Sequence, residues 1–254
     1  MNLPMISRKV AAALLAPGLL VAAWAAGVAV FRPEPFLLPA PGSVVSALVG
    51  QSGYLAAHAA TTLGEMIAGL AVGASCGVVV ALAAARFPQS APFLMPAIVT
   101  TQTLPVFAIA PLLVIWFGFG LGSKVAMAAL IIFFPVASAF YDGLRNTDRV
   151  ALDLARSWGA SPWLVLSKVR IPAALPQLAS GLKIAATLAP IGAIVGEWAG
   201  ASGGLGYVML QANARSQTDL VFAAVVILAV TALALRFAVA RLCDWMVFWQ
   251  SHSL

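Results

Sequence analysis

Residues 146–176 read NTDRVALDLARSWGASPWLVLSKVRIPAALP, a long polar stretch inside a chain that is 62% hydrophobic. Two short helices are expected within it. The first covers about residues 147–158 and stops at Gly159, because glycine adopts the left-handed conformation that commonly ends a helix. The second starts at Ser161, a side-chain N-cap, and is expected to end before Pro172, which lacks the N–H that a helix interior needs.

Each of these two helices has a polar side and an apolar side. The apolar residues are Leu152, Ala155 and Trp158 in the first helix and Trp163, Leu166 and Val169 in the second. This pattern suits an element that lies at a membrane surface and touches a second protein.

The chain as a whole is too hydrophobic for a soluble domain, with a mean hydropathy of +1.01 and only 9% charged residues. A membrane-spanning helix needs roughly 20 apolar residues, and the long apolar runs lack the alternation of a β-barrel strand. We therefore predict an all-α polytopic membrane helical bundle of about six transmembrane helices. The predicted spans are residues 10–31, 59–85, 92–117, 123–141, 179–200 and 219–240. The first span follows Arg8 and Lys9, but its apolar run is longer than that of a typical signal peptide, which favours a retained span.

The formal net charge of +6 is interpreted through its distribution rather than as a sign of nucleic-acid binding. With the N-terminus inside, eleven basic residues lie on the cytoplasmic side and three on the outer side, as the positive-inside rule requires. Both termini are then cytoplasmic, and anionic membrane lipid is the partner of the basic residues. The inner group is Arg8, Lys9, Arg86, Arg145, Arg149, Arg156, Lys168, Arg170, Lys183, Arg236 and Arg241, and the outer group is Arg32, Lys124 and Arg215.

We expect three regions in one folded unit. Residues 1–58 hold the N-terminal transmembrane helix and an external interfacial segment, and residues 59–245 form the transport core. The core includes a cytoplasmic coupling loop, residues 142–178, and residues 246–254 form a cytoplasmic tail.

The polar stretch resembles the cytoplasmic EAA loop of ABC-importer permeases. The family pattern has an acidic residue, a small residue two positions later, a glycine six positions later and a proline thirteen after the glycine. Aspartate replaces the usual glutamate here and Leu154 replaces the usual first alanine, although the helix and its turn are retained. The matching residues are Asp153, Ala155, Gly159 and Pro172, and the resemblance extends from about Leu38 to Trp245.

This resemblance implies the inner-membrane permease subunit of a bacterial importer. Its implied partners are two ABC ATP-binding subunits, a second permease copy and a periplasmic or lipid-anchored substrate-binding protein. The residues implied to contact the ATPase are Asp153, Ala155, Arg156, Ser157, Gly159 and Pro172. The stretch from Gln102 to Asp148 looks closer to thiamine-precursor permeases than to the sulfonate branch, so a pyrimidine precursor of thiamine is the expected solute, with sulfonate, taurine or nitrate as alternatives.

No catalytic site is expected in this chain. It has no G-x4-G-K-[ST] phosphate loop, so ATP must be bound by a partner subunit, and no cofactor is expected. Residues 200–203 read GASG, as in rhomboid proteases, but His252 lies on the wrong side of the membrane and His58 lacks the expected place in a later span. No metal-ligand spacing is present, and Cys76 and Cys243 are interpreted as packing residues.

Polar residues within the spans are the candidates for the pathway or its gate. The span at 92–117 contains three prolines, which kink helices, and Thr101, Gln102 and Thr103 lie beside the kink. They either face the pore or satisfy backbone groups that the prolines leave free. Glu65 and Glu197 lie in apolar runs, where a charge usually faces protein or water. Glu197 is either part of an external gate or, as we favour, a hydrogen-bonded structural residue.

A second class of function is an ion-gradient-driven secondary transporter without an ATPase partner. Such a protein is expected to have internal inverted repeats and a membrane-embedded ion site. No convincing repeat is visible in the sequence, and charges within the spans are sparse. An ATP-binding protein that co-purifies with the chain discriminates between the two classes.

Overall fold

The computed structural model describes the backbone of residues 3–249 and the side chains of Leu15 and residues 18–249. This part of the chain is all helical and contains no strand, which confirms the predicted fold class. The α-helices are α1 (Leu3–Phe31), α2 (Pro41–Gly50), α3 (Ser52–Arg86), α4 (Ala91–Thr103), α5 (Val106–Phe117), α6 (Leu121–Arg145), α7 (Arg149–Ser157), α8 (Pro162–Val165), α9 (Ile171–Gly200), α10 (Leu205–Ala214) and α11 (Thr218–Met246).

Four helical segments in the described part are long and apolar enough to cross a membrane, namely α3, α6, α11 and the segment Pro162–Gly200. The pair α4 and α5 makes a fifth span if its two halves count together. The sixth predicted span, residues 10–31, falls on α1 (Leu3–Phe31), where the described portion Gly18–Phe31 is apolar. Five of the predicted ranges therefore have a matching helical segment, and the sixth stays a prediction.

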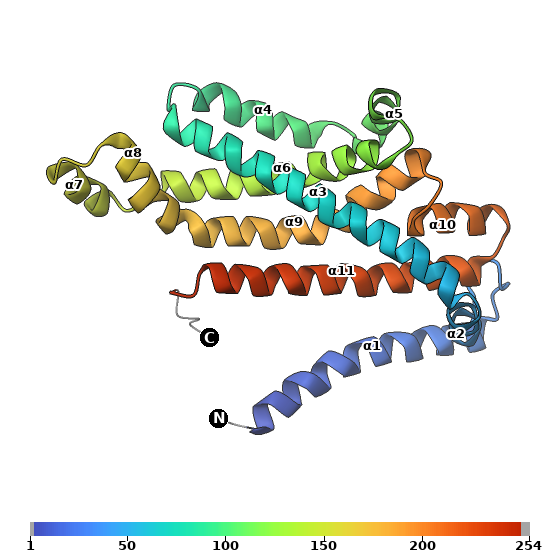
Figure 1. Ribbon diagram of the computed structural model, residues 1–254. Coiled ribbons are helices and arrows are strands. Elements are labelled where there is room, and N and C mark those ends of the chain that lie inside the picture. Colours follow the sequence, from blue (N-terminus) through green and yellow to red (C-terminus); the bar gives the residue numbers. More distant parts are fainter. Residues whose placement is uncertain (1–2, 250–254) are drawn as a thin grey trace.

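Helices α6 and α9 form the centre of the bundle, and α3 crosses α6 (Figure 1). The core side chains include Ile132, Val136 and Phe140 from α6, which pack against small residues of α9 such as Ala185 and Ala189. Small residues let two helix backbones approach closely, so these helices pack with little space for larger side chains.

The glycines of α3 face this centre. A Cβ placed on Gly73 would lie 2.8 Å from the carbonyl oxygen of Ala129 in α6, a separation that real side chains do not adopt. A Cβ placed on Gly69 or Gly77 would also lie very close to atoms of α6. Glycines spaced by four residues along one face of α3 thus let its backbone approach α6 closely.

The predicted end of the second coupling-loop helix before Pro172 is wrong. Helix α8 continues through a π-helical turn, Leu166–Arg170, into α9, so that Pro162–Gly200 is one helical segment of 39 residues. In this turn the Ile171 N–H reaches back five residues to the Leu166 carbonyl. Pro172 therefore lies inside this continuous segment, directly after the π-helical turn, where the wider backbone gives its ring room.

The two ends of the bundle carry different elements. Helices α7 and α8 project from one end, at the left of Figure 1, and the C-terminal end of α11 points to the same side. Helices α2 and α10 lie at the opposite end. Helix α9 runs from the first end to the second, which places its first turn near the coupling loop and its last turn near α10.

Candidate functional site

Helix α7 is closed at both ends by local hydrogen bonds. At its start the Asp148 carboxylate accepts the Val150 N–H at 3.0 Å, so the N-cap is Asp148 and the helix begins two residues later than predicted. At its end the Gly159 N–H donates to the Arg156 carbonyl at 2.9 Å, and the Ala160 N–H donates to the Ala155 carbonyl at 3.1 Å. This pair of bonds is a Schellman motif, which fixes the stop of the helix.

Gly159 has the left-handed conformation that the sequence predicted, with φ of +78°. No atom outside its immediate chain neighbours lies within 4 Å of the place where its Cβ would be, so the backbone angle is what selects glycine here. The spacing between Ala155 and Gly159 therefore has a direct structural meaning, because both residues take part in the same helix stop.

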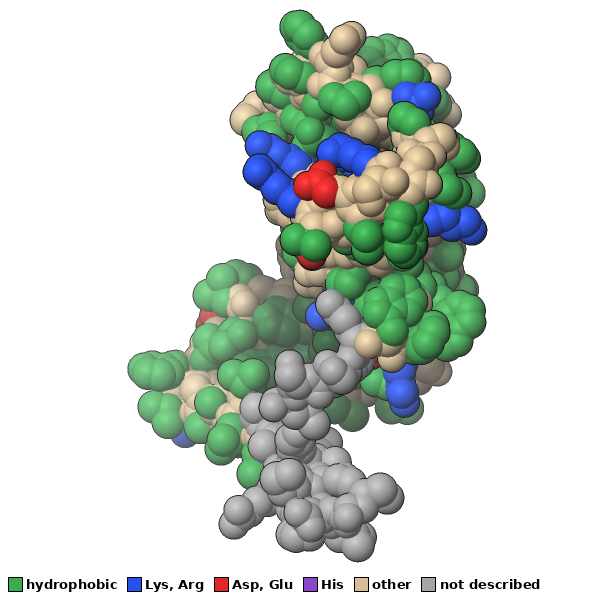
Figure 2. All heavy atoms as spheres, turned by 90° about the vertical axis from the view of Figure 1, so that its left-hand side faces the viewer, with side chains coloured by type: hydrophobic (Ala, Val, Ile, Leu, Met, Phe, Trp, Pro, Cys, Tyr) green, Lys and Arg blue, Asp and Glu red, His purple; other side chains and the backbone are tan. Residues whose placement is uncertain are grey.

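The outer face of α7 and α8 is exposed and carries both apolar and charged side chains. We call it the coupling surface and define it as Val150, Asp153, Leu154, Arg156, Trp158 and Trp163. Trp158 is 80% exposed and Trp163 is 63% exposed, whereas Leu152 on the inner side of α7 is buried. Figure 2 views this end of the molecule and shows Lys and Arg side chains around an acidic one, with hydrophobic side chains nearby. Large exposed apolar side chains beside charged ones are typical of a protein interface.

The charged residues of the coupling surface are only weakly held. Arg156 and Asp153, which lie three residues apart on α7, form an ion pair of 3.2 Å. Both side chains are largely exposed to solvent. The Ser157 hydroxyl donates to the Leu154 carbonyl at 2.8 Å. An exposed pair of this kind contributes about 0–1 kcal/mol, so these side chains remain available to a partner.

The predicted proline kink near Pro105 is a complete break. Helices α4 and α5 are bent by 100° at Leu104 and Pro105, and they form a broken span or a re-entrant loop. The Thr101 and Thr103 hydroxyls donate to the carbonyls of Ile98 and Thr100, at 2.6 and 2.8 Å. These hydroxyls therefore bond to carbonyls within α4, and whether Thr101, Gln102 and Thr103 face a pathway stays a prediction. Gln102 is exposed at the end of α4.

At the opposite end of the bundle, Glu197 caps helix α10. The residue is 1% exposed, and its carboxylate accepts hydrogen bonds from the N–H groups of Gly206 and Tyr207, the latter at 3.3 Å. The Thr62 hydroxyl of α3 donates to Glu197 Oε1 at 2.6 Å and accepts the Leu205 N–H at 2.8 Å. A carboxylate at a helix N-terminus is favoured by the free N–H groups and by the helix dipole.

The loop before α10 is shaped around this carboxyl group. Gly204 has φ of +107°, and a Cβ at that position would collide with the Glu197 carboxyl. The Gly204 N–H donates to His58 Nδ1 at 2.9 Å, and the His58 ring packs against Tyr207. Since Nδ1 of His58 already accepts a backbone N–H, the ring serves to hold this loop.

Glu65 is the second buried acid and lies in α3, one turn after Thr62. Its Oε1 is 2.9 Å from the Lys124 ammonium of α6, with side-chain exposures of 1% and 7%. The two groups form a buried ion pair that joins α3 to α6. We call His58, Thr62, Glu65, Lys124 and Glu197 together the outer polar cluster.

Several residues of these two regions were not predicted. The sequence suggested neither Thr62 nor Lys124 as a partner of the buried glutamates, because no local pattern links residues from α3, α6 and α9. On the coupling surface, Val150 and Leu154 were not predicted as contact residues, although they are 73% and 50% exposed. A helical wheel of α7 with Leu152 on the inner face would have found both. Among the described residues no group of three or more His, Cys, Asp or Glu can hold a metal ion.

Comparison with known proteins identifies related chains over almost the whole length. Residues 53–248 match the family described as binding-protein-dependent transport system inner membrane component. A probable ABC transporter permease protein of Haemophilus influenzae is 47% identical over 92% of this chain and 94% of its own. The formylaminopyrimidine transport permease protein ThiX of Halalkalibacterium halodurans is 34% identical, over 87% of this chain and 88% of its own. The taurine transport system permease protein TauC of Escherichia coli is 31% identical, over 94% and 91%.

A solved structure shares the fold. An inward-facing structure of the MetNI methionine ABC transporter contains a chain that superposes with a TM-score of 0.68 at 18% sequence identity. The match covers 78% of this chain and 98% of that one. At this identity the likeness concerns the arrangement of the helices alone.

Proposed function

This chain belongs to the family of binding-protein-dependent inner-membrane transport components and is an ABC transporter permease subunit, and we propose that it serves an ATP-driven importer. The coupling surface is the observation that carries the proposal. Helix α7 is capped at both ends and projects from one end of the bundle with exposed tryptophan beside a loosely held ion pair. An ATP-binding subunit fits that surface, because a separate protein must supply the nucleotide site.

The assembly that we propose contains two copies of this chain, two ABC ATP-binding subunits and a periplasmic or lipid-anchored binding protein. The end with α7 and α8 faces the cytoplasm, and both termini lie on that side. The orientation is supported by the five arginines that line the hollows at this end, Arg86, Arg145, Arg149, Arg156 and Arg170, as the positive-inside rule expects. In this assembly the chain itself has no catalytic role.

The continuous segment Pro162–Gly200 suggests how a push on the coupling surface reaches the outer side. Asp153, Ala155, Arg156, Ser157 and Gly159 form or shape the part that the ATPase touches, and Pro172 lies in the first turn of α9. Helix α9 then carries the motion to Glu197, which holds α10 and the preceding loop. A continuous helical segment that joins two ends of a bundle can transmit a domain motion between two discrete arrangements. Glu65 and Glu197 are then structural residues that hold together the end of the bundle around α10, which moves with α9.

The transported solute is proposed to be a small polar heterocycle, with a pyrimidine precursor of thiamine as the best candidate. The formylaminopyrimidine permease is 34% identical to this chain, and the taurine permease is 31% identical, so a sulfonate is the alternative. Lys124 supports the first choice. It lies in the outer polar cluster, and its charge is already matched by Glu65 at 2.9 Å, which leaves it a poor partner for a sulfonate.

Growth on defined nutrients tests this substrate. The gene is deleted in a strain that cannot make the thiamine pyrimidine, and growth is measured on limiting hydroxymethylpyrimidine and, separately, with taurine or an alkanesulfonate as sulfur source. We expect a defect only on the pyrimidine, restored by the gene on a plasmid. A defect confined to the sulfonate contradicts the pyrimidine assignment and leaves the importer assignment unaffected.

A further inference from the structure

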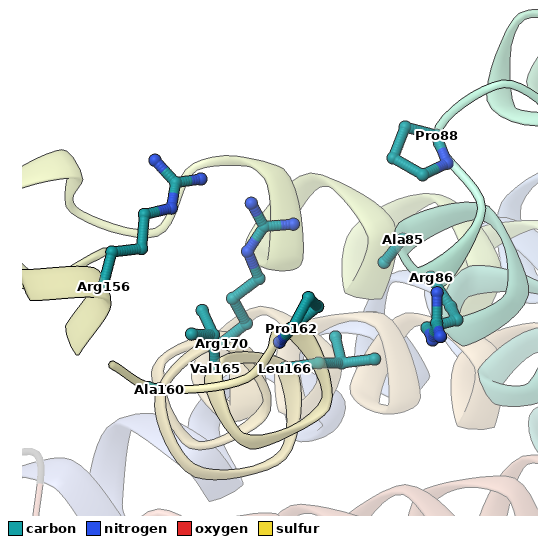
Figure 3. Close-up of a pocket in the computed structure, with 9 residues that line it drawn as sticks. All are labelled: Ala85, Arg86, Pro88, Arg156, Ala160, Pro162, Val165, Leu166 and Arg170. Atoms are coloured by element: carbon teal, nitrogen blue, oxygen red, sulfur yellow. The ribbon is translucent and has the colours of Figure 1, made fainter. Parts of the chain in front are cut away.

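A cavity of about 290 Å³ lies between the end of α3 and the start of the Pro162–Gly200 segment (Figure 3). Arg86, Arg156 and Arg170 line it, together with apolar residues. In Figure 3 the guanidinium groups of Arg156 and Arg170, which come from α7 and from the π-helical turn, extend in the same direction. Three separate elements therefore bring positive charge to one hollow.

Neighbouring hollows extend this basic region. One of about 760 Å³ shares Arg156 and Arg170 and adds Arg145 and Arg149 to its lining. A smaller one of about 200 Å³ is lined by both Arg145 and Arg170. Arg170 borders all three and is the central residue of what we call the arginine pocket, defined as Arg86, Arg145, Arg156 and Arg170.

The acidic residues nearby do not neutralise the arginine pocket. Asp153 pairs with Arg156 in solvent, and Asp148 accepts the Val150 N–H as the cap of α7. Asp142 lines a separate hollow together with Arg145. The Asp142 carboxylate and the Arg145 guanidinium do not form an ion pair. Among the described residues, Arg86, Arg145 and Arg170 form no ion pair. The pocket thus keeps an excess of positive charge.

Arg170 also has an unused hydrogen-bond donor. Its Nε atom is buried and has no hydrogen-bond partner among the described residues. A buried donor without an acceptor costs about 1–3 kcal/mol, and more when the group is charged. An acceptor supplied from outside the chain removes this cost, and an oxyanion satisfies several guanidinium donors at once.

The position of the pocket indicates where such an oxyanion comes from. Arg86 is the last residue of α3 and Arg145 is the last residue of α6, and both helices are membrane spans. Phe87 follows Arg86 directly and is 59% exposed. Basic and aromatic residues at the ends of spans lie at the level of the lipid headgroups.

We propose that the arginine pocket binds a phosphate-type oxyanion, carried by an anionic phospholipid headgroup or present as free phosphate. Arginine suits this ligand because its planar group donates two parallel hydrogen bonds to a phosphate. A phosphate bound here contacts Arg156 of α7 and Arg170 before α9, and so it braces the coupling loop against the spans. A lipid ligand would link the stability of the coupling loop to the membrane composition.

Thermal unfolding of the purified, delipidated full-length chain in neutral detergent tests the proposal. The additions are phosphatidylglycerol, a phosphate-free glycolipid with the same acyl chains, and inorganic phosphate against chloride at equal ionic strength. We expect phosphatidylglycerol to raise the unfolding midpoint by roughly 3 °C more than the glycolipid. Arg170→Gln should lose most of this gain. The matched control Arg241→Gln removes an arginine near the same end, on α11 outside the pocket, and should keep it.

Arg156→Gln provides a second variant, since Arg156 is largely exposed and its loss does not threaten folding. It should lose part of the gain. If inorganic phosphate alone gives the whole gain, the oxyanion site stands and its ligand is free phosphate. An equal gain from the glycolipid, or an undiminished gain in both variants, overturns the proposal and favours an acidic side chain of the ATPase as the partner of these arginines.

Discussion

Lys124 Nζ lies 2.9 Å from Glu65 Oε1, and both side chains are almost completely buried between α6 and α3. The pair stands beside Glu197, which caps α10 and accepts a hydrogen bond from Thr62. These contacts tie α3, α6, α9 and α10 together at one end of the bundle. The outer polar cluster is therefore a polar core within the apolar bundle, with Lys124 as its matched cation.

Removing one partner of this ion pair should be more harmful than removing both. Lys124→Met leaves an uncompensated carboxylate in the interior, which is expected to cost about 3–5 kcal/mol of stability. The double variant Glu65→Met with Lys124→Met should recover most of that loss. Thermal unfolding in detergent of the wild type, Lys124→Met, Glu65→Met and the double variant measures the difference. Additive losses in the double variant would show that the two side chains do not interact.

Close packing of α3 on α6 is tested by two glycines of the same helix. Gly73→Ala places a Cβ 2.8 Å from the Ala129 carbonyl oxygen, and overpacking of this kind is expected to cost about 1–3 kcal/mol. Gly64→Ala meets no atom within 4 Å and should be neutral or slightly stabilising, because alanine favours the helix. Unfolding midpoints in detergent report both effects. Equal midpoints for the two variants would contradict the packing seen between α3 and α6.

The orientation of the chain is tested by single cysteines at three exposed serines, with Cys76→Ser as background because Cys76 is exposed. Ser52→Cys and Ser202→Cys lie at the end with α2 and α10, and they should react with an impermeant thiol reagent in intact spheroplasts. Ser157→Cys lies on α7 and should react only after the membrane is permeabilised. The reverse labelling pattern would place the coupling surface outside the cell and remove the basis for its contact with an ATPase.

The sequence predicted the helical bundle well because spans and helix stops have local signals. Apolar length identified five of the helical segments, and Gly159 marked the end of α7 with the left-handed conformation it was expected to have. The extension of the helix through Pro172 was missed, because the π-helical turn that accommodates this proline has no recognisable sequence signal. The break at Pro105 was underestimated for a related reason, since a proline predicts distortion but not its angle.

The contacts of the site were less predictable than its position. Asp153, Ala155 and Gly159 were chosen from the resemblance to the EAA loop, and the structure places them in α7 and at its C-terminal stop. The partners of Glu197 could not be predicted, because Thr62 and Gly206 come together only when α3, α9 and α10 pack. The same holds for Arg86 and Arg170, which are distant in sequence and border one cavity.

ATP-driven uptake by a reconstituted complex tests most directly whether α7 couples this chain to an ATPase. The chain is co-purified with its ATP-binding subunit, placed in proteoliposomes with the binding protein, and compared with Gly159→Val and Gly159→Asn. Valine at φ of +78° should strain the helix stop by roughly 1–2 kcal/mol, whereas asparagine tolerates this conformation. We predict that the wild-type chain and Gly159→Asn support uptake that requires ATP, and that Gly159→Val assembles and inserts but loses most of it. Normal uptake by Gly159→Val, or uptake driven by an ion gradient without the ATPase, would contradict the account.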